Sequence, residues 1–311
     1  MKELKIQEND SNQRFDKYLK RVLPNAGTGF IYKMLRKKNI TLNEKKADGS
    51  EKLNTGDLVK IWFSDDTFAK MSGADIRDEY YHSLKETPHD VCIVYEDEDM
   101  IIINKPSGIK SQKDNDNDIS INEMAISYMI SSGQLSEDSF KRFHPSVCNR
   151  LDRNTSGIVL FAKNLHAAQQ LSKALKNRSC KKLYRAVVVG RITTEQLIEG
   201  YLSKDEATNK VTISDIEFPN SKPIKTAYRP IKNIGDDFTL IEIHLITGRT
   251  HQIRAHLASV GHPILGDNKY GNTIINKDKK VSGQLLHAYS IEFSDGMKFV
   301  CDPPGEFDGY I

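Results

Sequence analysis

The hydrophobic pattern of the first sixty residues predicts two helices followed by short strands. An apolar stripe at helical spacing consists of Phe15, Leu19, Val22 and Leu23. After a loop, a second helix is expected to begin near Thr28 and to end in Arg36-Lys37-Lys38, where cations suit the negative end of the helix dipole. Runs at 40–42 and 59–63 are typical of strands.

The pattern changes after residue 63. Residues 64–88 are acidic with little apolar periodicity, which predicts a linker with one short helix near 75–84. Beyond it, strands are expected at 91–94, 100–104, 158–161 and 183–189, and helices at 120–130, 166–175 and 251–260. Residues 201–246 alternate like antiparallel strands, and the polar stretch 114–118 predicts a mobile loop. We expect Thr250 to cap the helix after it.

Composition narrows the class of protein. Charged residues make up 28% and hydrophobic residues 38%, as in a globular chain. No apolar run is long enough to span a membrane and no signal segment follows Met1, so we expect a cytoplasmic protein. The cysteines are far apart and form no Cys-x-x-Cys pair, which argues against a disulfide framework and a zinc site.

Charge is distributed unevenly along the chain. Residues 1–63 hold 14 basic and 8 acidic residues, a net charge of +6, whereas residues 64–100 have −8 and the remainder +5. A cluster of four cations can neutralise phosphates and consists of Lys33, Arg36, Lys37 and Lys38. An ordinary exposed helix end is the alternative interpretation.

The stretch Cys148–Gly157 combines charged side chains of opposite sign and is a candidate for a catalytic site. It places Asp152 between Arg150 and Arg153, just before a buried strand. An aspartate ionises at about pH 4, so we expect a carboxylate at neutral pH. From these residues alone, a surface turn in which the aspartate caps backbone amides is the favoured interpretation.

Histidines near the C-terminal helix offer no convincing metal site. A metal site of His251, His256 and His262 is not favoured, because a five-residue step does not align two ligands on one helical face and we identify no acidic ligand to complete the group. His251 and Arg254 are three apart and occupy neighbouring positions on one face. We therefore expect no metal.

Five motifs in order along the chain resemble those of the RluA-type RNA pseudouridine synthases. They are Asn-Lys-Pro-Ser-Gly at 104–108, Arg-Leu-Asp-x-x-Thr-Ser-Gly at 150–157, Lys-Lys-Leu-Tyr-Arg-Ala at 181–186, Thr-Gly-Arg-Thr-His-Gln-Ile-Arg at 247–254 and Leu-His-Ala at 286–288. One position departs from the family pattern, because residue 149 is Asn where the family usually has His.

The resemblance implies a reaction without cofactor or metal, in which uracil is detached from its ribose, rotated and rejoined through carbon. Asp152 would act on the sugar as nucleophile or base, Arg254 would hold it charged, and Tyr184 would stack on the base and take the departing ring proton. Arg150 would fill the space of the extruded uridine or bind phosphate, and Lys105 would belong to the floor of the site, among the RNA-binding residues.

Residues 1–63 resemble a small RNA-binding domain first described in a ribosomal protein. This arrangement favours large-subunit ribosomal RNA as substrate, with transfer RNA as the alternative. A non-catalytic RNA-binding or ribosome-assembly protein would explain the basic segment but not the three site residues. A glycoside hydrolase would need a pair of carboxylates, and the motif offers one.

The resulting expectation is an α+β chain. A small N-terminal α+β RNA-binding domain at 1–63 and an acidic linker at 64–88 precede a catalytic domain at 89–311. That domain is predicted to contain a mixed, mainly antiparallel sheet with flanking helices and loops. We expect a monomer that does not bind membranes.

Overall fold

The computed structural model describes residues 1–115, 118–206 and 208–310. The predicted loop at 114–118 falls partly outside these residues. Contacts divide the chain into two compact units. The first unit holds Met1–His89, Met124–Ser146 and Lys163–Ala167, and the second holds Asp90–Glu123, Val147–Ala162 and the chain from Ala168 onward. No helix among the described residues is long and apolar enough to cross a membrane.

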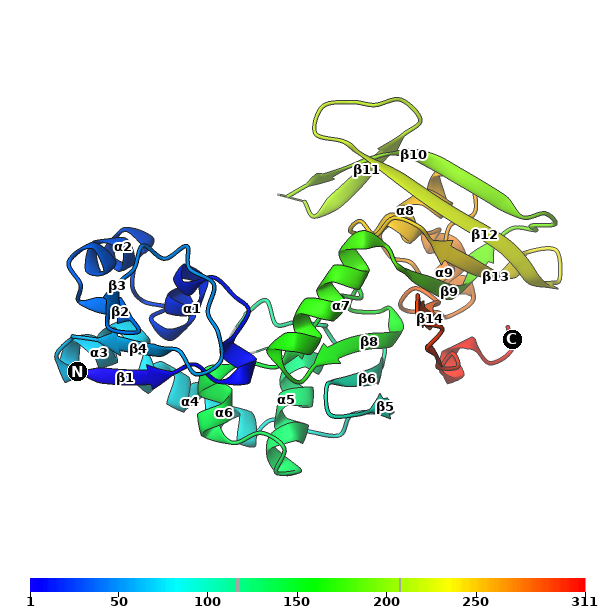
Figure 1. Ribbon diagram of the computed structural model, residues 1–311. Helices are drawn as coiled ribbons and strands as arrows, with labels where there is room; N and C mark the ends of the chain where they lie inside the picture. The colour runs from blue at the N-terminus through cyan, green and yellow to red at the C-terminus, as the bar shows by residue number, and fades with distance from the viewer. Residues whose placement is uncertain (116–117, 207, 311) are drawn as a thin grey trace. The chain divides into compact units, whose positions relative to one another are not determined.

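The first unit contains a four-stranded antiparallel sheet in the order β1-β4-β2-β3, with helices packed on it (Figure 1). Its elements up to residue 61 are β1 (Lys2–Lys5), the 3-10 turn η1 (Glu8–Asp10), α1 (Phe15–Val22), α2 (Thr28–Arg36), β2 (Ile40–Leu42), β3 (Lys45–Lys46) and β4 (Leu58–Ile61). Phe15 and Leu19 of α1, Ile31 of α2 and Val59 of β4 are fully buried in one core. Three residues of the predicted apolar stripe, Phe15, Leu19 and Leu23, are therefore buried in this core, and Val22 packs against it.

Residues 64–88 were predicted to be a linker with one short helix near 75–84; that helix is present, and a second one precedes it. These are α3 (Asp65–Ser72), which Ser64 caps, and α4 (Ala74–Lys85). Phe68 and Met71 of α3 pack against the core of the small sheet, and the Tyr81 hydroxyl of α4 donates to the Leu135 carbonyl. Further helices are α5 (Ile121–Ser131), α6 (Glu137–Arg142) and α7 (Leu165–Asn177).

The second unit is built on a large mixed sheet. Its main path runs β11-β10-β12-β13-β9-β14-β8-β6-β5. The strands are β5 (Ile93–Glu96), β6 (Met100–Lys105), β7 (Ser146–Val147), β8 (Ser156–Ala162), β9 (Cys180–Val189), β10 (Gln196–Asp205), β11 (Lys210–Ser214), β12 (Lys222–Ile234), β13 (Phe238–Leu245), β14 (Leu286–Phe293) and β15 (Lys298–Val300). All pairs on this path are antiparallel except β14 with β8. The predicted α+β class with a mainly antiparallel sheet is confirmed.

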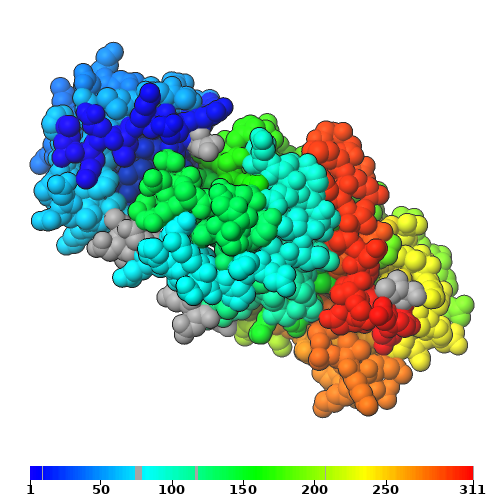
Figure 2. Space-filling model, turned by 90° about the horizontal axis from the view of Figure 1, so that it is seen from below, coloured from blue at the N-terminus to red at the C-terminus, as the bar shows by residue number. Residues whose placement is uncertain are grey.

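Strand β15 extends the C-terminal hairpin toward β5. The rings of Tyr95 in β5 and Phe299 in β15 lie 4.8 Å apart. Figure 2 shows these turquoise and red segments side by side on one face. The first and last strands of the second unit therefore pack together.

Helix α8 (Gln252–Ser259) packs against β11 and β12 (Figure 1). Its Ala255 joins a small apolar cluster with Leu202, Val211 and Ile224. The helix starts one residue later than predicted, because His251 is its N-cap in a left-handed conformation, so Thr250 is not the cap. The chain continues through α9 (Thr273–Asp278) and ends after the 3-10 turn η2 (Gly305–Phe307).

Candidate active site

Asp152 lies on a turn, here called the Asp152 turn (residues 148–157), which leads into β8. The turn is closed by the Thr155 amide, which donates to the Asp152 carbonyl at 3.0 Å. A second turn (residues 105–111) holds it from outside. The Gly108 amide donates to the Arg153 carbonyl at 2.9 Å, and the Ser111 hydroxyl bonds both the amide and the carbonyl of Leu151. These bonds fix the backbone on both sides of the carboxylate.

Asn149 has a clear local role in the same turn. Its amide nitrogen donates to the Ile158 carbonyl at 3.2 Å, and its amide oxygen accepts from the Leu160 amide at 2.7 Å. The side chain therefore satisfies two backbone groups of β8, one on each side of Val159. The departure from the family pattern is compatible with an ordered turn.

Gly157 marks the point where β8 meets β14. It has φ +108, and a Cβ at this position would lie 2.3 Å from the Ala288 carbonyl oxygen and 2.6 Å from its nitrogen. Only glycine permits this approach. The glycine of the motif is thus required by the parallel pairing that anchors the Asp152 turn.

The structure corrects the expected RNA contact of Lys105. Its side chain is fully buried, and its ammonium group donates to the carbonyls of Pro106, Ile109 and Arg153 at 2.7–3.1 Å. Burial lowers the pKa of Lys105 to about 7, partly opposed by the charge of Asp152. Lys105 joins the two turns from within and its side chain is not exposed to solvent, which agrees with a place in the floor of the site.

Arg254 of α8 contacts the Asp152 carboxylate, as expected from the motifs. Its Nη1 donates to Asp152 Oδ2 at 2.7 Å. The remaining face of the guanidinium is bound by a second carboxylate, since Nε and Nη2 donate to the two oxygens of Asp267 at 2.7 and 3.0 Å. Arg254 therefore bridges two aspartates, one partly exposed and one fully buried.

Sequence reasoning missed Asp267. It lies in the Leu-Gly-Asp-Asn-Lys-Tyr-Gly stretch 265–271, where one of its oxygens also accepts from the amides of Lys269 and Tyr270. Burial raises the pKa of Asp267, but the hydrogen bond and charge of Arg254 lower it by more. The net shift of the pKa is therefore downward. The signal available in the sequence was an acidic residue between Gly266 and Gly271, in a stretch that follows the apolar pair Ile264-Leu265.

The charges around Arg254 determine its ionisation. Burial alone lowers the pKa of Arg254, yet the hydrogen bonds and charges of Asp267 and Asp152 outweigh it and raise the pKa above its ordinary value. Arg254 is therefore a permanent cation in the site. Asp152 keeps a second oxygen, Oδ1, whose nearest basic group is His251 Nε2 at 4.0 Å.

Tyr184 of β9 lies in the middle of the sheet, paired with Ile243 of β13 and Ala288 of β14. Burial raises the pKa of Tyr184, and the nearby charge of Asp152 raises it further. The hydroxyl is therefore neutral. Arg150 is exposed and makes no hydrogen bond or ion pair with the part of the chain that the structure describes.

The three histidines considered for a metal make separate hydrogen bonds. His251 bonds the Tyr270 hydroxyl, His256 the Thr226 hydroxyl, and His262 the Val189 carbonyl. Within residues 1–115, 118–206 and 208–310, no group of three or more His, Cys, Asp or Glu side chains could hold a metal ion.

The basic surface of the first unit consists of Lys33, Arg36, Lys37 and Lys38. All four side chains are exposed at the end of α2, and Lys38 adopts a left-handed conformation that turns the chain into β2. Because none of them forms an ion pair with a described residue, their charges are available to a polyanion.

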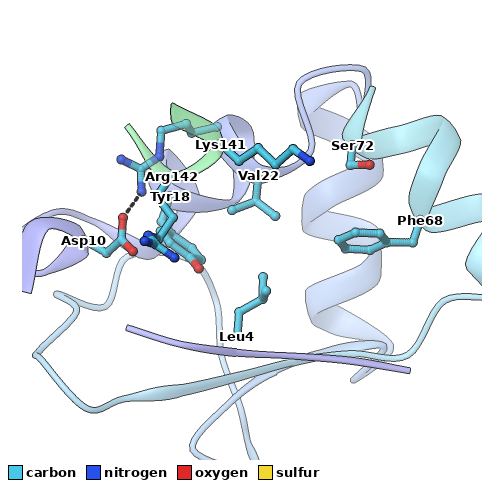
Figure 3. Close-up of a pocket in the computed structure, with 9 residues that line it drawn as sticks. Leu4, Asp10, Tyr18, Val22, Phe68, Ser72, Lys141 and Arg142 are labelled. Carbon is cyan, nitrogen blue, oxygen red and sulfur yellow. Dashed lines mark hydrogen bonds and ion pairs between the residues drawn. The ribbon is translucent and has the colours of Figure 1, made fainter. Parts of the chain in front are cut away.

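The described residues form a cavity in each unit. One, of about 250 Å³, lies in the first unit and is walled by Leu4, Val22 and Phe68, with the Asp10 ion pair at its side (Figure 3). The other, of about 230 Å³, lies in the second unit beside Ser107 and Asn154. Asp152 lines neither of them.

The geometry of one carboxylate held by a buried arginine beside a buried tyrosine agrees with a sequence comparison. The sequence model of the RNA pseudouridylate synthase family matches residues 99–259, which include Asp152, Tyr184 and Arg254. The chain belongs to this family. It is accordingly a pseudouridine synthase, an isomerase that acts on RNA.

Relatives of the family cover nearly the whole chain. A ribosomal large subunit pseudouridine synthase C of Rickettsia conorii is 35% identical over 91% of this chain and 90% of its own length. The protein of that name in Vibrio parahaemolyticus is 32% identical over 93% and 87%. An uncharacterized RNA pseudouridine synthase of Mycoplasma genitalium is 33% identical over 93% and 88%.

Two solved human structures named for an RNA pseudouridylate synthase domain share the fold. Human RNA pseudouridylate synthase domain containing 1 has a TM-score of 0.53 and 24% identity, covering 70% of this chain and 84% of that chain. Human RNA pseudouridylate synthase domain containing 4 has a TM-score of 0.55 and 20% identity, covering 76% and 95%. At this identity the likeness concerns the fold alone.

Proposed function

We propose that the protein converts a uridine of large-subunit ribosomal RNA to pseudouridine, with Asp152 as the group that acts on the ribose. The observation that carries this proposal is the 2.7 Å ion pair between Arg254 Nη1 and Asp152 Oδ2 at a partly exposed carboxylate. Arg254 pairs with the carboxylate through Oδ2 and orients it, while Oδ1 makes no hydrogen bond with a described residue. Relatives named for the large ribosomal subunit and similar over nine-tenths of the chain support the substrate class.

The chemistry needs a single carboxylate and no redox step. Either Asp152 attacks C1′ of the ribose and forms an ester as the bond to N1 breaks, or it removes the C2′ proton and uracil is eliminated. In both routes the bonding electrons leave with the base. The base then rotates and C5 bonds to C1′, as the ester bond to Asp152 breaks in the first route or as C2′ regains its proton from Asp152 in the second, and the C5 proton is released.

Tyr184 is assigned to stacking against the detached base. A neutral phenol cannot accept the C5 proton, and burial together with the Asp152 charge keeps Tyr184 neutral. We therefore retain the stacking role of Tyr184 and do not assign to it the removal of the C5 proton. Tyr184→Phe is accordingly expected to preserve more activity than Tyr184→Ala.

The first unit is assigned to RNA binding through the basic surface. Lys33, Arg36, Lys37 and Lys38 supply four exposed cations without protein partners among the described residues. Such contacts position RNA without reading its sequence. Arg150, exposed two residues before Asp152, is assigned to the extruded nucleotide or its phosphate.

The deciding experiment uses transcripts labelled with tritium at C5 of uridine. Tritium release from large-subunit ribosomal RNA but not from transfer RNA supports the proposal, and release from transfer RNA alone overturns its substrate class. Mapping pseudouridines in ribosomal RNA from cells with and without the protein then identifies the position. Extruding a base from a folded RNA costs a few kcal/mol. The transcripts should therefore be folded, so that the assay includes this cost.

A further inference from the structure

His251 begins helix α8 in a conformation that few side chains adopt. Its φ is 52°, in the left-handed region, while its carbonyl already accepts the first helical hydrogen bond from the Ala255 amide at 3.0 Å. A left-handed residue other than glycine is strained, and such strain concentrates at functional sites. The conformation places the imidazole ring beside Asp152, with its side chain mostly buried.

Tyr270 determines which ring nitrogen of His251 carries the proton. The Tyr270 hydroxyl accepts from the Val211 amide at 3.0 Å and lies 2.9 Å from His251 Nδ1. The hydroxyl hydrogen has no other acceptor within the described parts of the chain, so it is donated to Nδ1. The proton of the neutral ring is then on Nε2.

The neutral state of His251 follows from its surroundings. Burial lowers the pKa of His251, the charge of Asp152 partly opposes this, and the charges of Arg254 and Lys269 lower the pKa again. The net shift is downward. At neutral pH the ring is therefore an uncharged hydrogen-bond donor through Nε2.

The donor points into the reacting region and lacks a close partner. Nε2 lies 4.0 Å from Asp152 Oδ1, beyond hydrogen-bond distance, and no closer acceptor occurs within residues 1–115, 118–206 and 208–310. Arg254, by contrast, directs Nη1, Nε and Nη2 to two carboxylates. His251 is thus a donor beside the reacting oxygen that remains available to a substrate.

We propose that His251 donates a hydrogen bond from Nε2 to a carbonyl oxygen of uracil while the base is detached. This inference rests on the proposed role of Asp152. When the bond from C1′ to N1 breaks, uracil departs with the bonding electrons, and the negative charge spreads to its carbonyl oxygens. A fixed neutral donor stabilises that charge as it develops. No proton is transferred, and no further reactant is required.

The test compares two leaving groups. Fluorine at C5 withdraws electrons and stabilises the departing uracil anion, so a 5-fluorouridine substrate depends less on a donor. His251→Asn retains a residue that tolerates the left-handed conformation but shortens the side chain. In single-turnover reactions, we expect it to slow the disappearance of uridine by about 10²-fold. The loss with 5-fluorouridine in the same RNA should be below about tenfold.

Equal losses on the two substrates, or no loss on uridine, would overturn the inference. Tyr270→Phe provides a second variant, since it frees Nδ1 and lets the proton move from Nε2. It should show the same preference for 5-fluorouridine with a smaller loss, and equal losses would again contradict the role of His251. For each variant, the ratio of the two rate losses is measured on an RNA that the wild type modifies. A negative result would therefore concern His251 and not the proposed substrate class.

Discussion

The Asp152 turn and the basic surface hold their charges in different ways. Around Asp152 the ionised groups are partly or fully buried, and Arg254 is bound on two sides by Asp152 and Asp267 at 2.7–3.0 Å. On the basic surface four cations are exposed and have no partner among the described residues. Fixed charges suit a reaction that needs one geometry, and free charges suit a phosphate backbone whose path varies.

The comparison predicts its largest effect on folding for the buried half of the Arg254 network. Asp267→Asn leaves Arg254 with one carboxylate in a buried place, and removing a partner from a buried ion pair costs about 3–5 kcal/mol. Denaturant unfolding should show this loss, together with slower single-turnover modification.

The matched control is Asp236→Asn, which removes an exposed partner of Arg191 in the same unit. An exposed pair contributes about 0–1 kcal/mol, so this variant should unfold like the wild type. If the two variants lost equal stability, the buried network would not be the fixed element that we describe.

A buried histidine near the turn predicts a pH dependence. His287 bonds the Ser156 hydroxyl and the Cys301 carbonyl, and burial lowers its pKa to about 4 from 6.5. The unfolded chain therefore binds a proton below pH 6.5 that the folded chain rejects until about pH 4. Stability should fall as the pH decreases through this range, by about 3 kcal/mol from this group.

His287→Gln can keep one acceptor and one donor without the titration. The difference in unfolding free energy between wild type and variant should change between pH 7 and pH 4, because only the wild type titrates His287. A constant difference would show that this group is not held neutral by the fold.

The smallest predicted effect is that of a single cation on the basic surface. Lys37→Ala should weaken RNA binding by a few fold and reduce the slope of log affinity against log salt by about 1. Lys298→Ala, an exposed lysine of β15, should leave the slope unchanged. Identical slopes for Lys37→Ala and wild type would leave the surface as a solvated helix end. Modification of fully bound RNA should stay at the wild-type rate.

Sequence reasoning found the pair of Asp152 and Arg254 because their motifs occur together, although 102 residues separate them. It missed Asp267, since no helical or strand spacing relates that loop position to Arg254. It also placed Lys105 among the RNA-binding residues, on the resemblance of its turn to the family motif, although the lysine is fully buried. Three carbonyls that converge only after folding make its burial possible.

The missed helix α3 has a similar cause, whereas α4 coincides with the helix predicted near 75–84. Phe68 and Met71 are three residues apart, but a single pair gives little periodicity in an acidic segment. Their packing against the small sheet stabilises α3, and this tertiary contact is not visible in local propensity. The α1 stripe was predictable because it recurs over two turns of helix.

The most direct test of the central claim is single-turnover tritium release by Asp152→Asn on an RNA that the wild type modifies. The amide keeps the shape of the side chain and can still accept from Arg254, so unfolding and RNA binding should match the wild type. The account predicts a loss of release of roughly 10⁴-fold, because the group that acts on the ribose is gone. Release at the wild-type rate by the folded, RNA-bound variant would contradict it.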